Sequence, residues 1–158
     1  MMSYKEFVAM NPAYPALLSA FADAVGLPDA GAFLKTEEVV VDDITVSIYY
    51  EGDESIGEVV CFSMLGKPDA ADLPKVSQVL LEANYLWAGT GGATLGMSPE
   101  DQKIMCAVRL QIDGLTGESL ASTIDAFVDT ASFWKRWIAG EVESKPAPGM
   151  QDFQMQRI

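Results

Sequence analysis

The segment from Leu80 to Ile112 constrains the fold more than any other part of the chain. It reads LLEANYLWAGTGGATLGMSPEDQKIMCAVRLQI, a run with helical periodicity that meets a glycine cluster and continues as two short alternating segments around a turn. Helical spacing, then glycine, then period-two alternation predicts a helix that ends sharply and leads into a β-hairpin. The fold must therefore combine a helix with antiparallel strands.

The helical part of this segment is apolar on two faces. Side chains three and four residues apart share one face of a helix, so the apolar positions fall into stripes. One stripe consists of Val76, Val79, Leu80, Ala83, Leu86 and Trp87, and a second consists of Ser77, Leu81, Tyr85 and Ala88. Two interpretations remain open. The helix is buried in the middle of the domain, or it packs on the core with one stripe and on a second copy of the chain with the other.

The glycines that follow this helix do not form a nucleotide-binding motif. A phosphate-binding loop follows a strand and opens a helix, whereas Gly89, Gly91 and Gly92 follow a helix and open a strand. The spacing also fails, because Thr94 stands where a G-x-G-x-x-G motif needs glycine. We interpret the cluster as a helix end that needs positive φ, followed by a sharp reversal.

Length and composition indicate one domain. The chain has 158 residues, 49% of them hydrophobic, which is enough for one sizeable core and too few for two ordinary domains. We predict a single domain over residues 1–140 and a flexible C-terminal tail over residues 141–158, where Pro, Gly, Gln and charge mix without periodicity. The opening MMSYKEFVAM has neither a basic leader nor a long apolar stretch, and no run approaches membrane-spanning length, so we expect a cytoplasmic protein.

The charge balance is strongly acidic. Ten Lys and Arg residues stand against 23 Asp and Glu, which gives a formal net charge of -13. This field repels phosphate backbones and anionic lipids, so we expect no nucleic-acid partner and no membrane insertion. A basic or mixed polar and apolar polypeptide segment suits the field better, although an acidic surface can also simply keep a protein soluble.

The absence of histidine from the sequence excludes most catalytic and metal-binding arrangements. Without it there is no Ser-His-Asp or Cys-His constellation and no usual zinc site. The acidic pairs Glu37-Glu38, Asp42-Asp43 and Glu100-Asp101 stand where the pattern predicts strand ends or turns, so we interpret them as solvated turn residues. The acidic run at 51–54 lacks the spaced ligands of a calcium loop and is interpreted as a hairpin loop. We expect no catalytic residue, no metal and no cofactor.

Two cysteines, Cys61 and Cys106, each lie inside an alternating apolar segment. A free thiol in such a position behaves as a small hydrophobic side chain. We predict that both are reduced core residues.

The remaining patterns predict an α+β fold in the order helix, three strands, helix, two strands, helix, with an antiparallel sheet packed against helices. The residues between Asp29 and Thr36 are interpreted as a loop, and a short helix over Tyr4 to Met10 is possible. The expected elements are a helix from about Pro15 to Val25, strands at Glu38 to Val41, Ile44 to Tyr50 and Val59 to Leu65, a helix from about Leu73, strands at Ala93 to Met97 and Ile104 to Ile112, and a helix from Thr116 to about Gly140.

Two stretches, EANYLWAGTGGATLGMSPEDQKIMCAVRL and FVDTASFWKRW in the last helix, resemble the Tir chaperone (CesT-like) family of type III secretion chaperones. The resemblance extends from about Ala16 to Ile138, and its most specific part runs from Leu80 through Gly96 into the following hairpin. It implies a small acidic cytoplasmic bacterial protein that forms a homodimer and has no enzyme activity.

The resemblance also implies a partner. Family members bind the N-terminal chaperone-binding region of a secreted effector and keep it soluble and export-competent. The effector-binding patches on the first helix and the sheet would then include Leu17, Phe21, Val25, Val46 and Ile48. The dimer contact would include Leu80, Leu81, Tyr85 and Trp87. We predict that Phe21→Asp weakens effector capture and leaves the dimer intact, whereas unfolding of this variant would show that the first-helix stripe is core and not binding surface.

Two other classes of function stay open at this stage. A chaperone-like fold can serve as a regulatory module that binds a folded signalling partner and has no part in secretion, or its central cleft can hold a small molecule. Enzyme activity is the least supported class, because the sequence has no histidine and no nucleophile motif.

Overall fold

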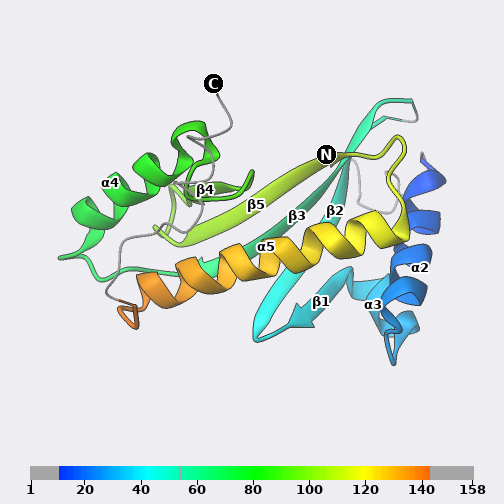
Figure 1. Cartoon of the computed structure of the whole chain (residues 1–158), viewed down its shortest axis with the longest axis horizontal. Coiled ribbons are helices and arrows are strands. Elements are labelled where there is room, and N and C mark those ends of the chain that lie inside the picture. Colours follow the sequence, from blue (N-terminus) through cyan, green and yellow to red (C-terminus); the bar gives the residue numbers. More distant parts are fainter. Residues whose placement is uncertain (1–10, 54, 143–158) are drawn as a thin grey trace, which may run out of the picture. The chain divides into compact units, whose positions relative to one another are not determined.

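The computed structural model describes residues 11–53 and 55–142. It confirms the predicted α+β fold, with one short helix added before the first strand and one 3-10 turn added after the central helix (Figure 1). The elements are α2 (Ala13–Val25), α3 (Ala30–Thr36), β1 (Glu38–Val41), β2 (Ile44–Gly52), β3 (Gly57–Gly66), α4 (Leu73–Asn84), η1 (Tyr85–Trp87), β4 (Thr94–Met97), β5 (Ile104–Gln111) and α5 (Gly117–Ile138). The predicted lead helix over 4–10 and the predicted tail from residue 143 onward lie outside the described residues.

The five strands form one sheet in the order β1-β2-β3-β5-β4, which leaves β1 and β4 as its edges. The pairs β1–β2, β2–β3 and β4–β5 are antiparallel. Asp42 and Asp43, with φ of 47° and 67°, make the two-residue turn between β1 and β2, where Val41 pairs with Ile44. Positive φ at both central residues is what such a hairpin turn needs, and Asp tolerates it well.

The chain forms two compact units, each built from two separate segments. Among the described residues, the first contains residues 11–53 and 55–62 together with Arg109–Ala126, and the second contains Ser63–Val108 together with residues 127–142. The single domain over residues 1–140 stays a prediction.

The core of the first unit lies between α2 and the buried face of β2. Tyr14 of α2 lies against Tyr50 of β2, with ring centroids 5.6 Å apart, and Phe21 lies 5.4 Å from Phe33. The predicted strand from Ile44 to Tyr50 is confirmed within β2, where every second side chain is buried: Ile44, Val46, Ile48 and Tyr50. The side chain of Asn11 donates a hydrogen bond to the Tyr50 hydroxyl at 2.7 Å and so fixes the chain just before α2.

The interpretation of Asp29 to Thr36 as a loop is wrong, because residues 30–36 form helix α3. The side chain of Asp29 accepts a hydrogen bond from Ala32 N at 2.9 Å, which satisfies one free donor at the helix start. Phe33 is buried against Phe21, so this helix is stabilised by one apolar anchor and a cap. A single anchor gives no helical periodicity that the sequence could reveal.

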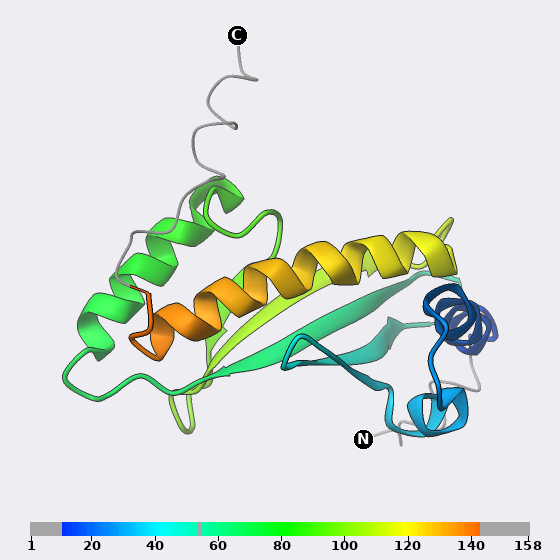
Figure 2. The ribbon, with the colours of Figure 1, turned by 60° about the horizontal axis from the view of Figure 1, so that its bottom comes forward.

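The second unit is centred on Trp134, which is fully buried. Its ring contacts Phe133 and Trp137 edge-on, with centroids 5.3 and 5.5 Å away. The end of α5 lies beside the start of α4 (Figure 2), and a hollow of about 320 Å³ lined by Lys75 and Ile138, among others, separates their side chains. The predicted last helix is confirmed as α5, and its buried side chains share one stripe: Leu120, Ile124, Phe127, Val128, Ala131 and Trp134.

The predicted continuation of the central helix through Leu86 and Trp87 is wrong. Helix α4 ends at Asn84, and both later residues adopt left-handed backbone conformations, with φ of 51° and 56°. Their side chains are exposed, so they do not extend the buried stripe formed by Val76, Leu80 and Ala83.

Candidate partner-binding surfaces

An apolar groove runs along the first unit beside the edge strand β1. It has a volume of about 270 Å³ and is lined by side chains from the end of α2, from β1 and from the first half of α5. Val25 and Val40 are 43% and 67% exposed, whereas Phe21 and Ile124 are buried and form the floor. The lining residues are Phe21, Val25, Leu27, Val39, Val40, Val41, Ala121, Ile124 and Asp125. Eight of these nine side chains are apolar, so the groove can accept apolar side chains from a partner.

The backbone of β1 is also available at this groove. Ile48 N donates to Glu37 O at 2.9 Å, and this bond together with the register Val39↔Val46 fixes the alternation of the ladder. The N–H and C=O groups of Val40 therefore point away from β2, toward the open edge. One residue thus offers both its side chain and its backbone to a strand laid along β1.

The predicted effector-binding residues occupy two different environments. Leu17, Phe21, Val46 and Ile48 are core residues of the first unit, with at most 5% of each side chain exposed. Phe21 alone among these four lines the groove, as part of its floor. Val25 both lines the groove and is exposed. The structure therefore brings Phe21 and Val25 to one surface and leaves the other three inside.

A second apolar surface lies in the second unit, at the C-terminal end of α4. Leu81 and Tyr85 are 72% and 73% exposed, and Trp87 is 54% exposed. Leu86, between them, is exposed as well. Four large apolar side chains within seven residues are an unusual concentration for a protein surface in contact with water. We call Leu81, Tyr85, Leu86 and Trp87 the α4 apolar cluster.

The predicted dimer residues largely coincide with this cluster. Leu81, Tyr85 and Trp87 belong to it, but Leu80 is a core residue with 5% exposure. Leu86 completes the surface through its left-handed conformation, which the sequence pattern did not indicate.

The glycines after α4 connect the helix to β4, in agreement with the expectation from the sequence. Gly91 and Gly92 have φ of 60° and 98°, which a side chain would strain. At Gly89 a Cβ would lie 2.8 Å from the Cβ of Ala83, so this glycine permits close packing of the turn against α4.

One acidic residue departs from the prediction of solvated turn carboxylates. Glu37 ends α3 with φ of 56°, and its side chain is 7% exposed. Burial raises the pKa of this carboxyl from 4.5 to about 7. Its neighbour in the pair, Glu38, is exposed and accepts a hydrogen bond from the Ser47 hydroxyl.

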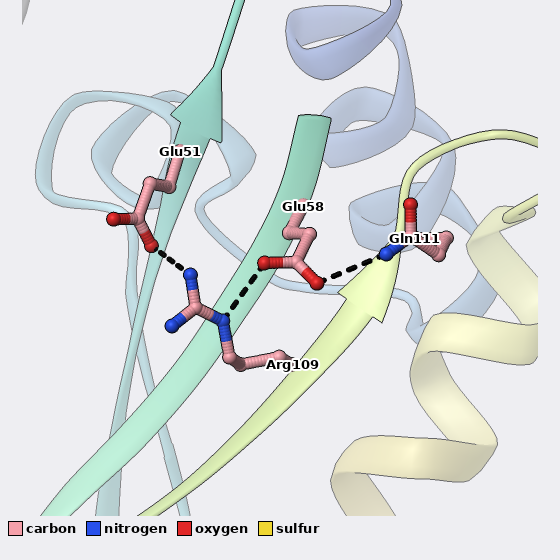
Figure 3. Close-up of polar contacts among 4 residues, drawn as sticks. All are labelled: Glu51, Glu58, Arg109 and Gln111. Atoms are coloured by element: carbon pink, nitrogen blue, oxygen red, sulfur yellow. Dashed lines mark hydrogen bonds and ion pairs between the residues drawn. The ribbon is translucent and has the colours of Figure 1, made fainter. Parts of the chain in front are cut away.

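A charged cluster covers part of the exposed sheet face of the first unit (Figure 3). Arg109 of β5 donates from Nε to Glu58 of β3 at 2.8 Å and from its terminal nitrogen to Glu51 of β2, and Gln111 donates to the other oxygen of Glu58 at 2.9 Å. The hydrogen bond to Glu58 and the charge of Glu51 raise the pKa of the arginine above its usual value. These contacts satisfy the charges across three neighbouring strands, so this face lacks the apolar character of the groove.

Both cysteine thiols are free and buried, which confirms that they are reduced core residues. Burial raises the pKa of Cys61 and of Cys106 to about 12. Within residues 11–53 and 55–142, no cluster of His, Cys, Asp and Glu could hold a metal ion. No helix in the same ranges is long and apolar enough to cross a membrane.

Sequence reasoning missed Val40 and Leu86 as surface residues. Val40 is one of three consecutive valines, and alternation with the buried Val39 could have placed it on the opposite face. For Leu86 the helical spacing pointed to the core, and no local signal marked the break after Asn84.

Comparison with known proteins identifies the family. The model of the Tir chaperone protein (CesT) family matches residues 16–135. A search of curated protein sequences finds no match. Among solved structures, the Yersinia pestis type III secretion chaperone SycH, in complex with a stable fragment of YscM2, is 22% identical, with a TM-score of 0.54 over 76% of this chain and 98% of that one.

Two further structures share the fold. A chain of the ExsC-ExsE complex is 16% identical, with a TM-score of 0.57 over 79% of this chain and 92% of that one. A chain of the HopA1-SchA chaperone-effector complex is 17% identical, with a TM-score of 0.55 over 78% of this chain and 94% of that one. These likenesses establish the fold, and the family model extends over well more than half of the sequence. The chain therefore belongs to the Tir chaperone protein (CesT) family.

Proposed function

We propose that the chain is a cytoplasmic type III secretion chaperone that binds the N-terminal segment of a secreted effector and keeps it soluble and export-competent. The observation that carries this proposal is the apolar groove beside the open edge of β1. The family is one of chaperones, which are not enzymes, so the groove is a binding surface and not a catalytic one.

The groove suits an extended polypeptide better than a folded surface. A segment laid along β1 can bond to the backbone of Val40 and place alternate side chains over Phe21 and Val25. Each large aliphatic side chain that becomes buried contributes about 1.5–3 kcal/mol. Several such contacts offset the conformational entropy that a disordered segment loses on binding.

The net charge of the chain also indicates which residues its partner carries. The formal net charge of -13 favours a segment that carries basic residues between its apolar ones. Among the relatives, SycH is in complex with a fragment of YscM2 and SchA forms a chaperone-effector complex with HopA1, which supports the proposal of an effector segment as ligand.

We further propose that the α4 apolar cluster is the contact between two copies of the chain. Leu81 lies in the last turn of α4 and Tyr85 follows directly after the helix end at Asn84, and both are more than 70% exposed. A two-fold contact between two such surfaces buries both clusters at once, because the same surface serves both partners.

The test is capture followed by truncation. Tagged chain is expressed in its own host, the proteins that co-purify are identified by mass spectrometry, and the N-terminal region of the main partner is then co-expressed alone with the chain. We expect this region to suffice for binding. Binding that requires only a folded C-terminal part of the partner would contradict the proposal.

A matched pair of variants links the result to the groove. Val40→Asp places a charge at the rim of the groove, and Ile56→Asp places one on a 73% exposed side chain of the loop between β2 and β3, outside the groove. We expect Val40→Asp to weaken binding of the N-terminal region at least about tenfold, the effect of 1.4 kcal/mol, and Ile56→Asp to leave it unchanged. Equal binding by both variants would exclude the groove as the site.

A further inference from the structure

Asn84, the last residue of α4, bonds to the edge strand β4 through both ends of its amide. Its Nδ2 donates to Leu95 O at 2.8 Å, and its Oδ1 accepts from Leu95 N at 2.9 Å. One side chain therefore satisfies both backbone groups of a single residue of β4.

The position of Leu95 explains why these backbone groups are available. Leu95 pairs with Cys106 of β5, and β4 is an edge strand. In an antiparallel ladder every second residue turns its N–H and C=O away from the neighbouring strand. The amide of Asn84 thus takes the place that a further strand would occupy, and it ties the end of α4 to the sheet edge.

A second bond holds the other end of the turn. The indole Nε1 of the buried Trp134 donates to Gly89 O at 3.0 Å. Gly89 N also donates to Ala83 O at 3.0 Å, and the close contact of Gly89 with Ala83 admits no side chain. Hydrogen bonds therefore hold the residues on both sides of segment 85–88, which are Asn84 and Gly89.

The chain between these residues takes an unfavourable path. Leu86 and Trp87 both have left-handed φ, at 51° and 56°, where large side chains are rarely found. Such conformations persist when the surrounding structure fixes them. Here the path turns Tyr85, Leu86 and Trp87 outward, whereas a continued helix would carry Leu86 and Trp87 along the buried stripe of α4.

We infer that Asn84 is a positioning residue for the dimer contact: by fixing the end of α4 on Leu95 it sets the left-handed turn that presents Leu86 and Trp87 to a second copy of the chain. The inference rests on the proposed dimer through the α4 apolar cluster. Asn84 itself acts through the turn and lies outside the cluster.

The test is a double-mutant cycle on dimer affinity, measured by sedimentation velocity. We expect Asn84→Ala to raise the dimer dissociation constant at least about tenfold at unchanged far-ultraviolet circular dichroism. The control is Ser98→Ala, which removes another side-chain bond to the backbone in the same unit, from Asp101 N to the Ser98 hydroxyl. Ser98→Ala should leave the dissociation constant unchanged.

The second arm of the cycle separates positioning from general stability. Trp87→Ala should weaken the dimer strongly in the wild-type chain and much less in the Asn84→Ala chain, because the tryptophan is no longer presented there. Strictly additive effects, or an unchanged dimer in Asn84→Ala, would overturn the inference.

Asn84→Asp is the second variant, because it keeps the acceptor for Leu95 N and loses the donor to Leu95 O. It should weaken the dimer in the same direction, and loss of folding in both variants would make Asn84 a purely structural residue and overturn the inference. A wild-type chain that is monomeric would instead refute the proposed dimer. In that case hydrogen exchange at Leu95 N–H in Asn84→Ala still shows whether the amide holds the turn.

Discussion

Gly117, the first residue of α5, lies directly against the backbone of Ala20 in α2. A Cβ at this position would come within 2.7 Å of Phe21 N and closer still to the carbonyl group of Ala20. Phe21 and Ala121, one residue and one turn further along, both line the apolar groove. The close approach of the two helices at Gly117 therefore sets the width of the groove at its base.

Gly117→Ala should destabilise the protein by about 1–3 kcal/mol, the usual cost of adding atoms to a packed site. The backbone atoms of Ala20 and Phe21 that the new Cβ would meet cannot move aside as a flexible side chain could. Urea unfolding followed by circular dichroism measures the change. Gly31→Ala in α3 is the control, because there a Cβ meets only an ordinary contact 3.6 Å from Asp29. The control should be neutral or stabilising, since alanine favours helix more than glycine does.

The strands and the long last helix could be predicted because their signals are local. Alternation in β2 and the three-and-four spacing in α5 each follow from one face being buried. Helix α3 and the end of α4 could not be predicted in the same way. The first depends on the contact of Phe33 with Phe21, and the second on the bonds of Asn84 to Leu95, both between residues distant in sequence.

The binding surfaces, too, depend partly on local sequence signals and partly on contacts that only the whole fold creates. A sequence can mark Val25 or Val40 as apolar, but the open edge of the sheet depends on the strand order, which is a property of the whole fold. Leu17, Val46 and Ile48 have the same apolar pattern as surface residues would have, and packing alone places them in the core.

Leu81→Asp and Tyr85→Asp should each dissociate the dimer, with the dissociation constant raised about 30-fold or more, because buried contact residues at interface centres contribute 2 kcal/mol or more. Both side chains are more than 70% exposed in the single chain, so folding should be preserved. Light scattering at micromolar concentration measures the mass. Leu80→Asp is the contrasting variant, since it places a charge in the core and should unfold the protein. A strictly monomeric wild-type chain would contradict the dimer.

Phe21→Asp should unfold the protein, in contrast to the loss of effector capture alone that the sequence predicted. The side chain is 2% exposed and lies against Phe33, so the new carboxylate would be buried without a partner. Thermal unfolding measures the loss. Val25→Asp, on the exposed wall of the groove, should keep the melting temperature within a few degrees and weaken effector binding. A folded Phe21→Asp protein would mean that this part of α2 can open.

Glu37 should make stability depend on pH. Burial raises its pKa in the folded state from 4.5 to about 7, so the folded chain binds a proton that the unfolded chain has lost between these values. The protonated Glu37 carboxyl stabilises the folded state fully below about pH 4.5, and this stabilisation is lost as the pH rises through about 7. Glu37→Gln should flatten this part of the profile and raise the melting temperature at pH 8. Melting temperatures of both proteins from pH 5 to 8 test this, and parallel curves would contradict it.

Cys61 and Cys106 should both resist alkylation and disulfide exchange in the folded protein. The nucleophile in these reactions is the thiolate, and burial raises both pKa values to about 12, so almost no thiolate forms at pH 8. Both side chains are also fully covered, which denies access to the reagent. Titration with a chromogenic disulfide at pH 8 should therefore detect no fast-reacting thiol in the native chain and two in denaturant.

The slow reaction of the native chain also measures how often each unit opens, because a buried thiol can react only when the fold opens. Cys61 belongs to the first unit and Cys106 to the second, so Cys61→Ser and Cys106→Ser proteins report on the two units separately. Equal opening rates would indicate that the units unfold together, and rapid reaction of either thiol in the native chain would contradict the buried environment.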